Sequence, residues 1–335
     1  MKTPLKAILS LMPLLGLLGT PAQAKPTKKV RIALIVESTV DDKGWCQAMH
    51  DAITAVQKKY GPALVEYSHS EKMKPVDAGS AARQYVNQKY DIIICHGAQY
   101  KNLVTELAPD FPNTSFAYGT NADIGGKNVF TYVPYSEETG YLNGIIAGMV
   151  TKTNIIGNVG SVDGGDSARY SRGFDLGVKS VNPKAKILHG HTGSFGDFVK
   201  AGELAQAQLK ASADVLTGSS QQAMGALRAV AESTGNVHWV GQDINQLNVP
   251  EGKKALACAG YNYAAVVEGL IDKREAGIKG GENLAMRFTN DGFRYQFSER
   301  KDLKVLTPAV RKAVEQAKAD LKSGKLKLDW KAVKL

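Results

Sequence analysis

The sequence has little that would support a disulfide framework, a membrane span or a phosphate-binding loop. Its three cysteines, Cys46, Cys95 and Cys258, are too few and too scattered for a disulfide-stapled fold, and each lies in or after an apolar run that favours a buried free thiol. Beyond residue 24, no stretch reaches the roughly 18 consecutive apolar residues that a membrane-spanning helix needs. There is no GxxxxGKS or GxxxxGKT loop, and the glycine-rich stretch 157–165 lacks the GxGxxG pattern. Nucleotide-phosphate binding is therefore weakly supported.

The first 24 residues have the pattern of an export signal. Lys2 and Lys6 precede an apolar run at residues 7–18, and a small-x-small sequence ends at Ala24. This pattern predicts a signal peptide over residues 1–24 that is cleaved after Ala24, and the lack of a cysteine after the apolar run predicts a product without a lipid anchor. Such a chain would work in the periplasm, where there is no ATP or NAD pool. We therefore expect a binding protein without a cofactor rather than a cofactor-dependent enzyme.

The formal net charge of +10 comes largely from the tail after residue 300. The lysines and arginines there are interspersed with Glu315 and Asp320, which is typical of a solvated helix face. Attraction to an anionic membrane or to nucleic acid is the less favoured interpretation. We expect a monomer with no nucleic-acid partner.

Short apolar strands alternate with amphipathic helices along the whole chain after the export signal. In the first predicted set, a helix carrying Ala48, Ala52, Val56 and Tyr60 on one face follows the first strand. The other elements of this set are strands at 30–37, 64–68, 91–95, 115–118 and 129–133 and helices at 76–88, 100–107 and 137–150. The second set comprises strands at 156–162, 185–189, 214–217, 238–242 and 255–259, helices at 167–181, 198–211, 224–233 and 264–276, and a last helix that opens at Pro308.

This alternation predicts an α/β protein with two doubly wound, parallel-sheet (Rossmann-like) lobes. Right-handed crossovers place every loop that follows a strand at the same edge of its sheet, and ligands bind outside the carboxyl ends of such strands. We therefore expect a ligand cleft between the two lobes, lined by the residues that directly follow the strands.

The residues at these strand ends are rich in aromatic rings and in uncharged or acidic hydrogen-bonding groups, and few are basic. Rings suit stacking on a flat heterocycle, and Asp, Asn and Gln suit the edges of a base or the hydroxyls of a sugar. The predicted ligand-binding residues are Asp42, Trp45, Cys46, His96, Gln99, Tyr118, Asn121, Arg169, Ser219, Asp243 and Tyr261.

Trp45 and Asp243 are the most specific of these candidates. Each could instead have a purely structural role. Trp45 follows Asp42-Lys43-Gly44 at the start of a helix, so we interpret it as a ring that stacks on the ligand rather than as an ordinary core ring. Asp243 ends a strand, where its carboxylate could accept two hydroxyl hydrogen bonds or could instead cap a turn.

Metal binding and covalent catalysis have weak support in the sequence. His189 and His191 lie two residues apart but have no further ligand pair at zinc spacing. Cys95 and His96 are neighbours, and adjacent strand residues point to opposite faces, so the imidazole could not activate the thiol. We predict no metal site and no enzyme activity.

Four stretches carry a resemblance to a known family: Asp-Asp-Lys-Gly-Trp after the first strand, and the stretches 141–160, 173–183 and 241–246. On the basis of these four stretches, the chain resembles the basic membrane protein (Bmp/PnrA-like) family of ABC-transporter solute-binding proteins. The resemblance implies a type I periplasmic binding protein fold, whose two lobes are joined by three crossovers. It also implies a purine base or nucleoside as ligand, and an ABC permease in the inner membrane as partner.

The same resemblance implies lobe boundaries and residue roles. The crossovers would lie near Pro134, near Gly260 and within 285–297. They give an N-terminal lobe of residues 25–134 plus 261–288 and a C-terminal lobe of residues 135–260 plus 289–335. The indole of Trp45 would stack on the base, and Asp243 would meet sugar hydroxyls.

The chain departs from the nucleoside-binding pattern of the family at two places. Cys46 stands where that pattern has Asn, and Gly260-Tyr261-Asn262 stands where a Lys often follows the strand. These departures favour a purine base or another flat heterocycle. A sugar is the alternative ligand, and a sensory receptor on the same scaffold is the alternative role. A nucleoside hydrolase would need clustered carboxylates, for which Asp41-Asp42 is the candidate pair.

Overall fold

The computed structural model describes residues 26–335, so the predicted signal peptide lies outside the described residues. The first sheet and its helices comprise β1 (Val30–Ile35), α1 (Trp45–Tyr60), β2 (Val65–Ser70), α2 (Pro75–Asn87), β3 (Ile92–Cys95), α3 (Lys101–Leu107), β4 (Ser115–Gly119), β5 (Val129–Pro134), α8 (Tyr263–Glu275) and β11 (Glu282–Met286). We call this part the N-terminal lobe.

The second sheet and its helices form the C-terminal lobe. They comprise α4 (Glu137–Val150), β6 (Ile155–Gly160), α5 (Gly165–Val181), β7 (Lys186–His191), α6 (Phe198–Lys210), β8 (Val215–Gly218), α7 (Ala223–Glu232), β9 (His238–Gly241), β10 (Ala255–Tyr261), β12 (Phe293–Phe297) and α9 (Pro308–Lys322).

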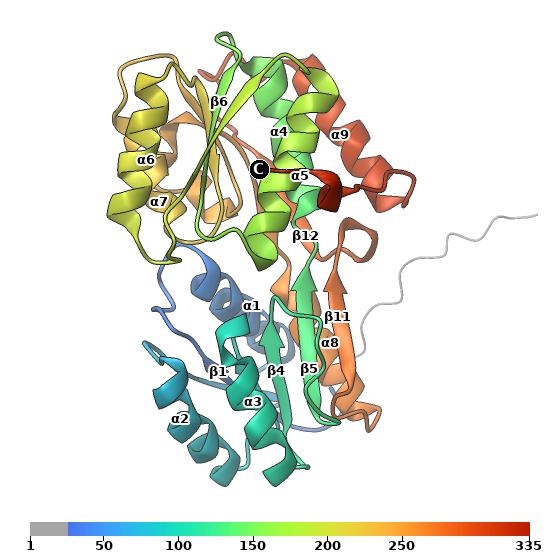
Figure 1. Ribbon diagram of the computed structural model, residues 1–335. Helices are drawn as coiled ribbons and strands as arrows, with labels where there is room; N and C mark the ends of the chain where they lie inside the picture. Colours follow the sequence, from blue (N-terminus) through green and yellow to red (C-terminus); the bar gives the residue numbers. More distant parts are fainter. Residues whose placement is uncertain (1–25) are drawn as a thin grey trace, which may run out of the picture.

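The two sheets are wound in the same way. Their strand orders are β11-β5-β4-β3-β1-β2 and β12-β10-β9-β8-β6-β7, with parallel pairing except for the antiparallel edge pair β10–β12. Figure 1 shows the lobes stacked one on the other, with α1 at their junction. The predicted fold class, two wound and mainly parallel sheets in two lobes, is confirmed. The edge strands β11 and β12 were not predicted as strands.

The chain passes between the lobes three times: between β5 and α4, between β10 and α8, and between β11 and β12. In Figure 1, β5 and β11 run side by side toward the upper lobe, where two of these crossings occur. The lobe boundaries predicted from the sequence lie near these three crossings. Their exact residues stay a prediction.

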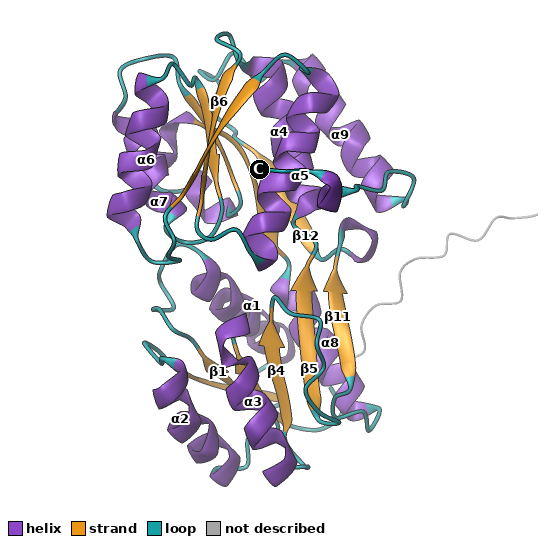
Figure 2. Ribbon diagram, in the orientation of Figure 1, coloured by secondary structure: helices purple, strands orange, loops and turns teal. Residues whose placement is uncertain are grey.

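Helices cover both faces of each sheet (Figure 2). This explains why the first strand is a continuous apolar run rather than an alternating one. Ile32 and Leu34 pack in the cluster that includes α1 and α8, whereas Ala33 and Ile35 pack in the cluster that includes α2 and α3. Successive side chains of a strand point to opposite faces, so a strand covered on both sides must be apolar at every position.

The two stretches that carry most of the family resemblance form a helix pair. At Gly144 of α4, an added Cβ would lie 2.1 Å from the carbonyl oxygen of Phe174, and at Gly177 of α5 it would lie 2.1 Å from that of Tyr141. The glycines let the two helix backbones approach closely. These motifs therefore build the C-terminal lobe and do not form the ligand site.

In the described part of the chain, no helix has both the length and the apolar character needed to cross a membrane. Cys46, Cys95 and Cys258 are all buried and free, as the sequence predicts.

Candidate functional site

A pocket of about 290 Å³ lies between the two lobes. It takes residues from both, all of them at or near the ends of strands, where the winding of the sheets predicts a ligand site. The lining residues are Glu37, Trp45, Cys46, His96, Gly97, Ala98, Gln99, Thr120, Val162, Gly164, Gly165, Asp166, Ser167, Phe195, Ser220 and Gln221.

Trp45 enters the pocket wall as the first residue of α1. The carboxylate of Asp42 fixes this helix start, because it accepts hydrogen bonds from the backbone N–H groups of Gly44 (3.0 Å), Cys46 (3.3 Å) and Gln47 (3.1 Å). The first N–H groups of a helix have no partner within the helix, and an acidic side chain here also suits the positive end of the helix dipole. Asp42, a predicted ligand-binding residue, thus positions Trp45 and is not among the lining residues.

His96 lies against one face of the Trp45 indole, with ring centroids 4.5 Å apart and planes 13° from parallel. One imidazole nitrogen, Nε2, is 3.0 Å from the carbonyl oxygen of Trp45, and the other, Nδ1, is 2.5 Å from the hydroxyl of Tyr132. A carbonyl only accepts, so Nε2 carries the hydrogen and Nδ1 accepts from Tyr132. Burial lowers the pKa of His96 to about 3, so the ring is neutral. His96 lines the pocket and also supports the indole.

Two tyrosines meet the Trp45 indole edge-on. Tyr261 and Tyr263 lie 5.2 and 5.5 Å from it, at interplanar angles of 81° and 84°. The hydroxyl of Tyr261 donates to Oδ2 of Asp166 at 2.6 Å. Tyr261 thus connects the indole of the N-terminal lobe with an acid of the C-terminal lobe, although it does not itself line the pocket.

Asp166 lies in the first turn of α5 and lines the pocket. Burial raises its pKa to about 6, although the hydroxyls of Ser136 and Tyr261 act in the opposite direction. The side-chain amide of Gln242 also approaches it, with Nε2 3.4 Å from Oδ2. Asp166 is not among the residues predicted from the sequence, although its place at the start of the helix that follows β6 was an available signal.

Asp243 is buried, with 8% of its surface exposed, and it is not among the lining residues. Its Oδ1 accepts from the backbone N–H of Asn245 at 2.8 Å, so it caps the short helical turn Ile244–Leu247. Burial, together with a smaller effect of the carboxylates of Asp42 and Asp51, raises the pKa of Asp243 to about 7. The sequence left open whether Asp243 caps a turn or meets a ligand, and in the structure it caps a turn.

Two further predicted residues belong to the pocket or lie directly behind its wall. Gln99 lines it and donates from Nε2 to Glu37 Oε2 at 2.9 Å. Ser219 is buried, and its hydroxyl is 2.8 Å from that of Ser167, a lining residue.

Besides Asp42, Tyr261 and Asp243, three further predicted residues do not line the pocket. Tyr118 packs in the core beside α2 and α3, because its position in β4 points to that face of the sheet. Asn121 accepts from the backbone N–H of Asp123 within its loop. Arg169 lies further along α5 and pairs with Glu137 at 3.1 Å.

Phe195 is the other informative residue that sequence reasoning missed. It lines the pocket from the C-terminal lobe with 48% of its surface exposed. Thr120 and Ser220, one from each lobe, also line it, and both have positive φ values, of 66° and 67°. Such backbone conformations are costly for residues other than glycine and are often found at functional sites.

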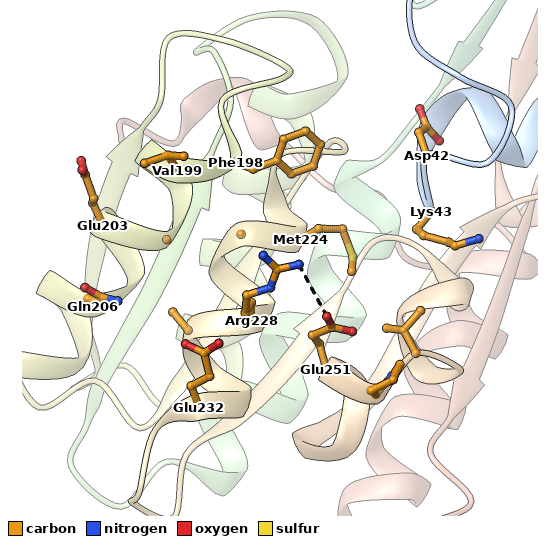
Figure 3. A pocket seen from close by; sticks show the side chains of 15 residues that line it. Asp42, Lys43, Phe198, Val199, Glu203, Gln206, Met224, Arg228, Glu232 and Glu251 are labelled. Atoms are coloured by element: carbon orange, nitrogen blue, oxygen red, sulfur yellow. Dashed lines mark ion pairs between the residues drawn. The ribbon is translucent and has the colours of Figure 1, made fainter.

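A larger space of about 640 Å³ lies nearby and is a groove on α6 and α7 (Figure 3). Its side chains include the exposed Val199 and an ion pair between Arg228 and Glu251 at 3.6 Å. Only Asp42 and Lys43 come from the N-terminal lobe, and Phe198 is its single aromatic lining residue. The pocket at Trp45 is the better candidate, because it lies at the strand ends of both lobes. Within residues 26–335, no group of three or more His, Cys, Asp or Glu side chains is placed to hold a metal ion.

Two wound lobes around a ligand-sized pocket define a two-lobed small-molecule-binding protein. Residues 29–289 match the family described as Bmp, ABC transporter substrate-binding protein PnrA-like, and the chain belongs to this family.

The chain is similar to several curated relatives. It is 27% identical over 199 residues to the CD4+ T-cell-stimulating antigen of Listeria innocua, an alignment that covers 57% of this chain and 55% of that protein. It is 24% identical over 326 residues to the nucleoside-binding protein BmpA of Lactococcus lactis (92% and 91%), and 24% identical over 205 residues to a purine-binding protein of Brucella abortus (60% and 57%). In the Listeria and Brucella alignments the chain thus spans little more than half of the relative's length.

Among solved structures, a solute-binding protein of an ABC transporter system from Aeropyrum pernix superposes with a TM-score of 0.76 at 17% identity. The superposition covers 89% of this chain and 92% of that one. At this identity the likeness concerns the fold.

Proposed function

We propose that this protein is the periplasmic receptor of an ABC importer, which captures a purine-like base or nucleoside between its lobes and delivers it to a permease in the inner membrane. In this proposal the signal peptide is cleaved after Ala24, and the mature protein is a monomer without a lipid anchor. The protein itself carries out no chemical reaction.

The observation that carries the proposal is the aromatic wall of the interlobe pocket. His96 stacks on the indole of Trp45, and two tyrosines contact it with their rings nearly perpendicular to its plane. Phe195 faces the same pocket from the other lobe. Rings contributed by both lobes suit a flat ligand that stacks between them, and closure of the lobes would complete the stack.

The spacing of the lobes supports a hinge that closes at the pocket. An added Cβ on Gly44 would lie 3.0 Å from Cβ of Gln221, so the start of α1 in one lobe is in close contact with the loop before α7 in the other. A ligand that contacts both lobes would favour this closed arrangement over an open one.

The names of relatives agree with this ligand class. The Lactococcus protein is described as nucleoside-binding and the Brucella protein as purine-binding. A sugar is the second candidate, because the carboxylate of Asp166, which lines the pocket, also suits hydroxyl groups.

A thermal-shift screen of residues 25–335 with bases, nucleosides and sugars tests the proposal. A ligand that binds only the folded state raises the melting temperature by mass action. We expect purines or their nucleosides to give the largest shifts. If only sugars raise the melting temperature, the proposed ligand class is wrong.

Substitution of Trp45 by Leu tests the site itself. Loss of the stacking ring should weaken binding of the best ligand by about tenfold or more. Trp330→Leu is the matched control, because Trp330 packs on Arg169 outside the pocket. Equal affinities of the two variants would contradict the assignment of the pocket.

A further inference from the structure

Tyr261 lies where the chain crosses from the C-terminal lobe to the N-terminal lobe, and it packs in both. It is the last residue of β10, and α8 begins two residues later at Tyr263. Its ring packs against the apolar cluster that includes α1 and α8 and against the cluster that includes α4 and α9. Among residues 26–335, no other side chain packs in clusters of both lobes. A side chain at a crossing moves little when the lobes rotate about it, so Tyr261 can keep both contacts as they close.

The ring of Tyr261 restricts the aromatic wall of the pocket. Its centroid lies 5.2 Å from that of the Trp45 indole, with the planes 81° from parallel, and it stacks on Tyr263 at 5.2 Å and 18°. Tyr263 meets the same indole at 5.5 Å and 84°. Perpendicular and stacked ring pairs have preferred geometries, so each ring restricts the orientation of the next. The position of the indole in the N-terminal lobe is therefore tied to Tyr261.

The hydroxyl of Tyr261 holds a residue of the other wall. It donates to Oδ2 of Asp166 at 2.6 Å, and Asp166 lies in the first turn of α5 and lines the pocket. A hydrogen bond from a hydroxyl to a carboxylate is short and strong. Tyr261 thus contacts one lining residue of each lobe, Trp45 with its ring and Asp166 with its hydroxyl, although it is not itself among the lining residues.

We propose that Tyr261 is a positioning residue of the site. It sets the affinity for the ligand without contacting it, because it holds the Trp45 indole of one lobe and the Asp166 carboxyl of the other at a fixed relative position. This inference rests on the proposed function, since it takes these two pocket-lining side chains as the groups that meet the ligand. A ligand that stacks on the indole then finds the carboxylate already in place, and less freedom is lost on binding.

Tyr261→Phe and Tyr263→Phe form a matched pair for the test. Each removes one hydroxyl from a ring that contacts the indole. The Tyr261 hydroxyl has Asp166 as its partner, whereas the Tyr263 hydroxyl is buried without a hydrogen-bond partner within the described chain. The probe is whichever of adenine, guanine, adenosine and guanosine binds the wild-type protein over residues 25–335 most tightly at pH 7. In isothermal titration calorimetry, Tyr261→Phe should bind this probe about fivefold or more weakly than Tyr263→Phe does.

The pH dependence of binding separates positioning from a general loosening of the fold. Burial and the charge of Glu137 raise the pKa of Asp166 to about 6, and the hydroxyls of Ser136 and Tyr261 and the guanidinium of Arg169 act in the opposite direction. Loss of the Tyr261 hydroxyl should therefore raise this pKa further. Affinity should fall as the pH is lowered from 8 to 5, because the carboxyl gains a proton. The midpoint of this fall should move to higher pH by about half a unit in Tyr261→Phe and should stay in place in the control variant.

Equal affinities of the two variants, or a midpoint that does not move in Tyr261→Phe, overturn the inference and leave the proposed function in place. The melting temperature of each ligand-free variant checks that it is folded. A Tyr261→Phe variant that does not fold would make the hydroxyl a requirement of the fold rather than of the site, and would also overturn the inference. Binding by the wild type decides the proposed function separately. If sugars bind and no purine or nucleoside does, the proposed function is wrong, and this inference falls with it.

Discussion

Replacing Asp243 with Asn should stabilise the ligand-free protein, and the gain should increase with pH. Asp243 is 8% exposed, and its Oδ1 accepts from the backbone N–H of Asn245. Asn has the same shape and keeps an oxygen for this hydrogen bond. The substitution therefore removes the negative charge and leaves the cap in place.

The size of the effect follows from the pKa of Asp243, which burial raises from 3.8 to about 7. Because the folded-state pKa lies above that of the unfolded chain, the folded protein keeps this proton over a wider pH range. The contribution of the neutral carboxyl to stability is complete below about pH 4 and is lost as the pH rises toward 7. A shift of about three pKa units corresponds to about 4 kcal/mol.

Asn does not titrate, so the difference between the two proteins isolates this one group. The unfolding free energy of Asp243→Asn minus that of the wild type should increase by about 3 kcal/mol between pH 5 and pH 8. Urea unfolding of both proteins at several pH values, without ligand, measures this difference. All other titrating groups are common to both proteins and largely cancel.

Asp163→Asn is the control for this experiment, since Arg172 holds the pKa of Asp163 below its ordinary value of 3.8. The difference between this variant and the wild type should therefore not change between pH 5 and pH 8. A difference between Asp243→Asn and the wild type that stays constant from pH 5 to pH 8 would refute the reasoning. It would mean that the carboxyl of Asp243 has an ordinary pKa in the folded protein.

Three further predictions concern packing, closure and pH. Gly144→Ala should lower the unfolding free energy by about 3 kcal/mol or more, because its Cβ would lie 2.1 Å from a backbone oxygen. Gly269→Ala is the control. It has open space around it, so it should be neutral or slightly stabilising in the same melting experiment. Gly44→Ala should weaken ligand binding in calorimetry by a larger factor than Gly269→Ala does, because its Cβ would lie 3.0 Å from Cβ of Gln221 of the other lobe in the closed arrangement, whereas Gly269 has open space around it. Affinity for a purine or nucleoside that donates a hydrogen bond to Asp166 should fall between pH 7 and pH 5, because this pocket-lining carboxyl has a pKa of about 6 and ceases to be a pure acceptor when it gains a proton. Calorimetry at the two pH values measures this, and equal affinities would contradict it.

The fold class could be predicted from the sequence because strands and helices each leave a pattern in neighbouring residues. A strand such as β1, covered by helices on both faces, must be apolar at every position, and this is visible without any structure. The edge strands β11 and β12 were missed for the converse reason. They lie at the rims of the sheets, where most of their residues are only half-buried and the apolar signal is weak.

Part of the candidate site was also predictable. Trp45, Cys46, His96 and Gln99 line the pocket as expected, because they follow strands whose carboxyl ends meet at one edge. Tyr118 could not be placed correctly, because its direction depends on which face of β4 it occupies.

The sequence by itself determined that this chain winds into two α/β lobes and that an indole stands at the start of the helix after its first strand. Both follow from the periodicity of neighbouring residues. Only the tertiary structure decided the polar side of the pocket, where Asp166 meets Gln242 and Tyr261, which lie 76 and 95 residues further along the chain. Their proximity is set by the packing of separate strands and helices, and so is the burial that raises the pKa of Asp166. No local pattern in the sequence records that packing.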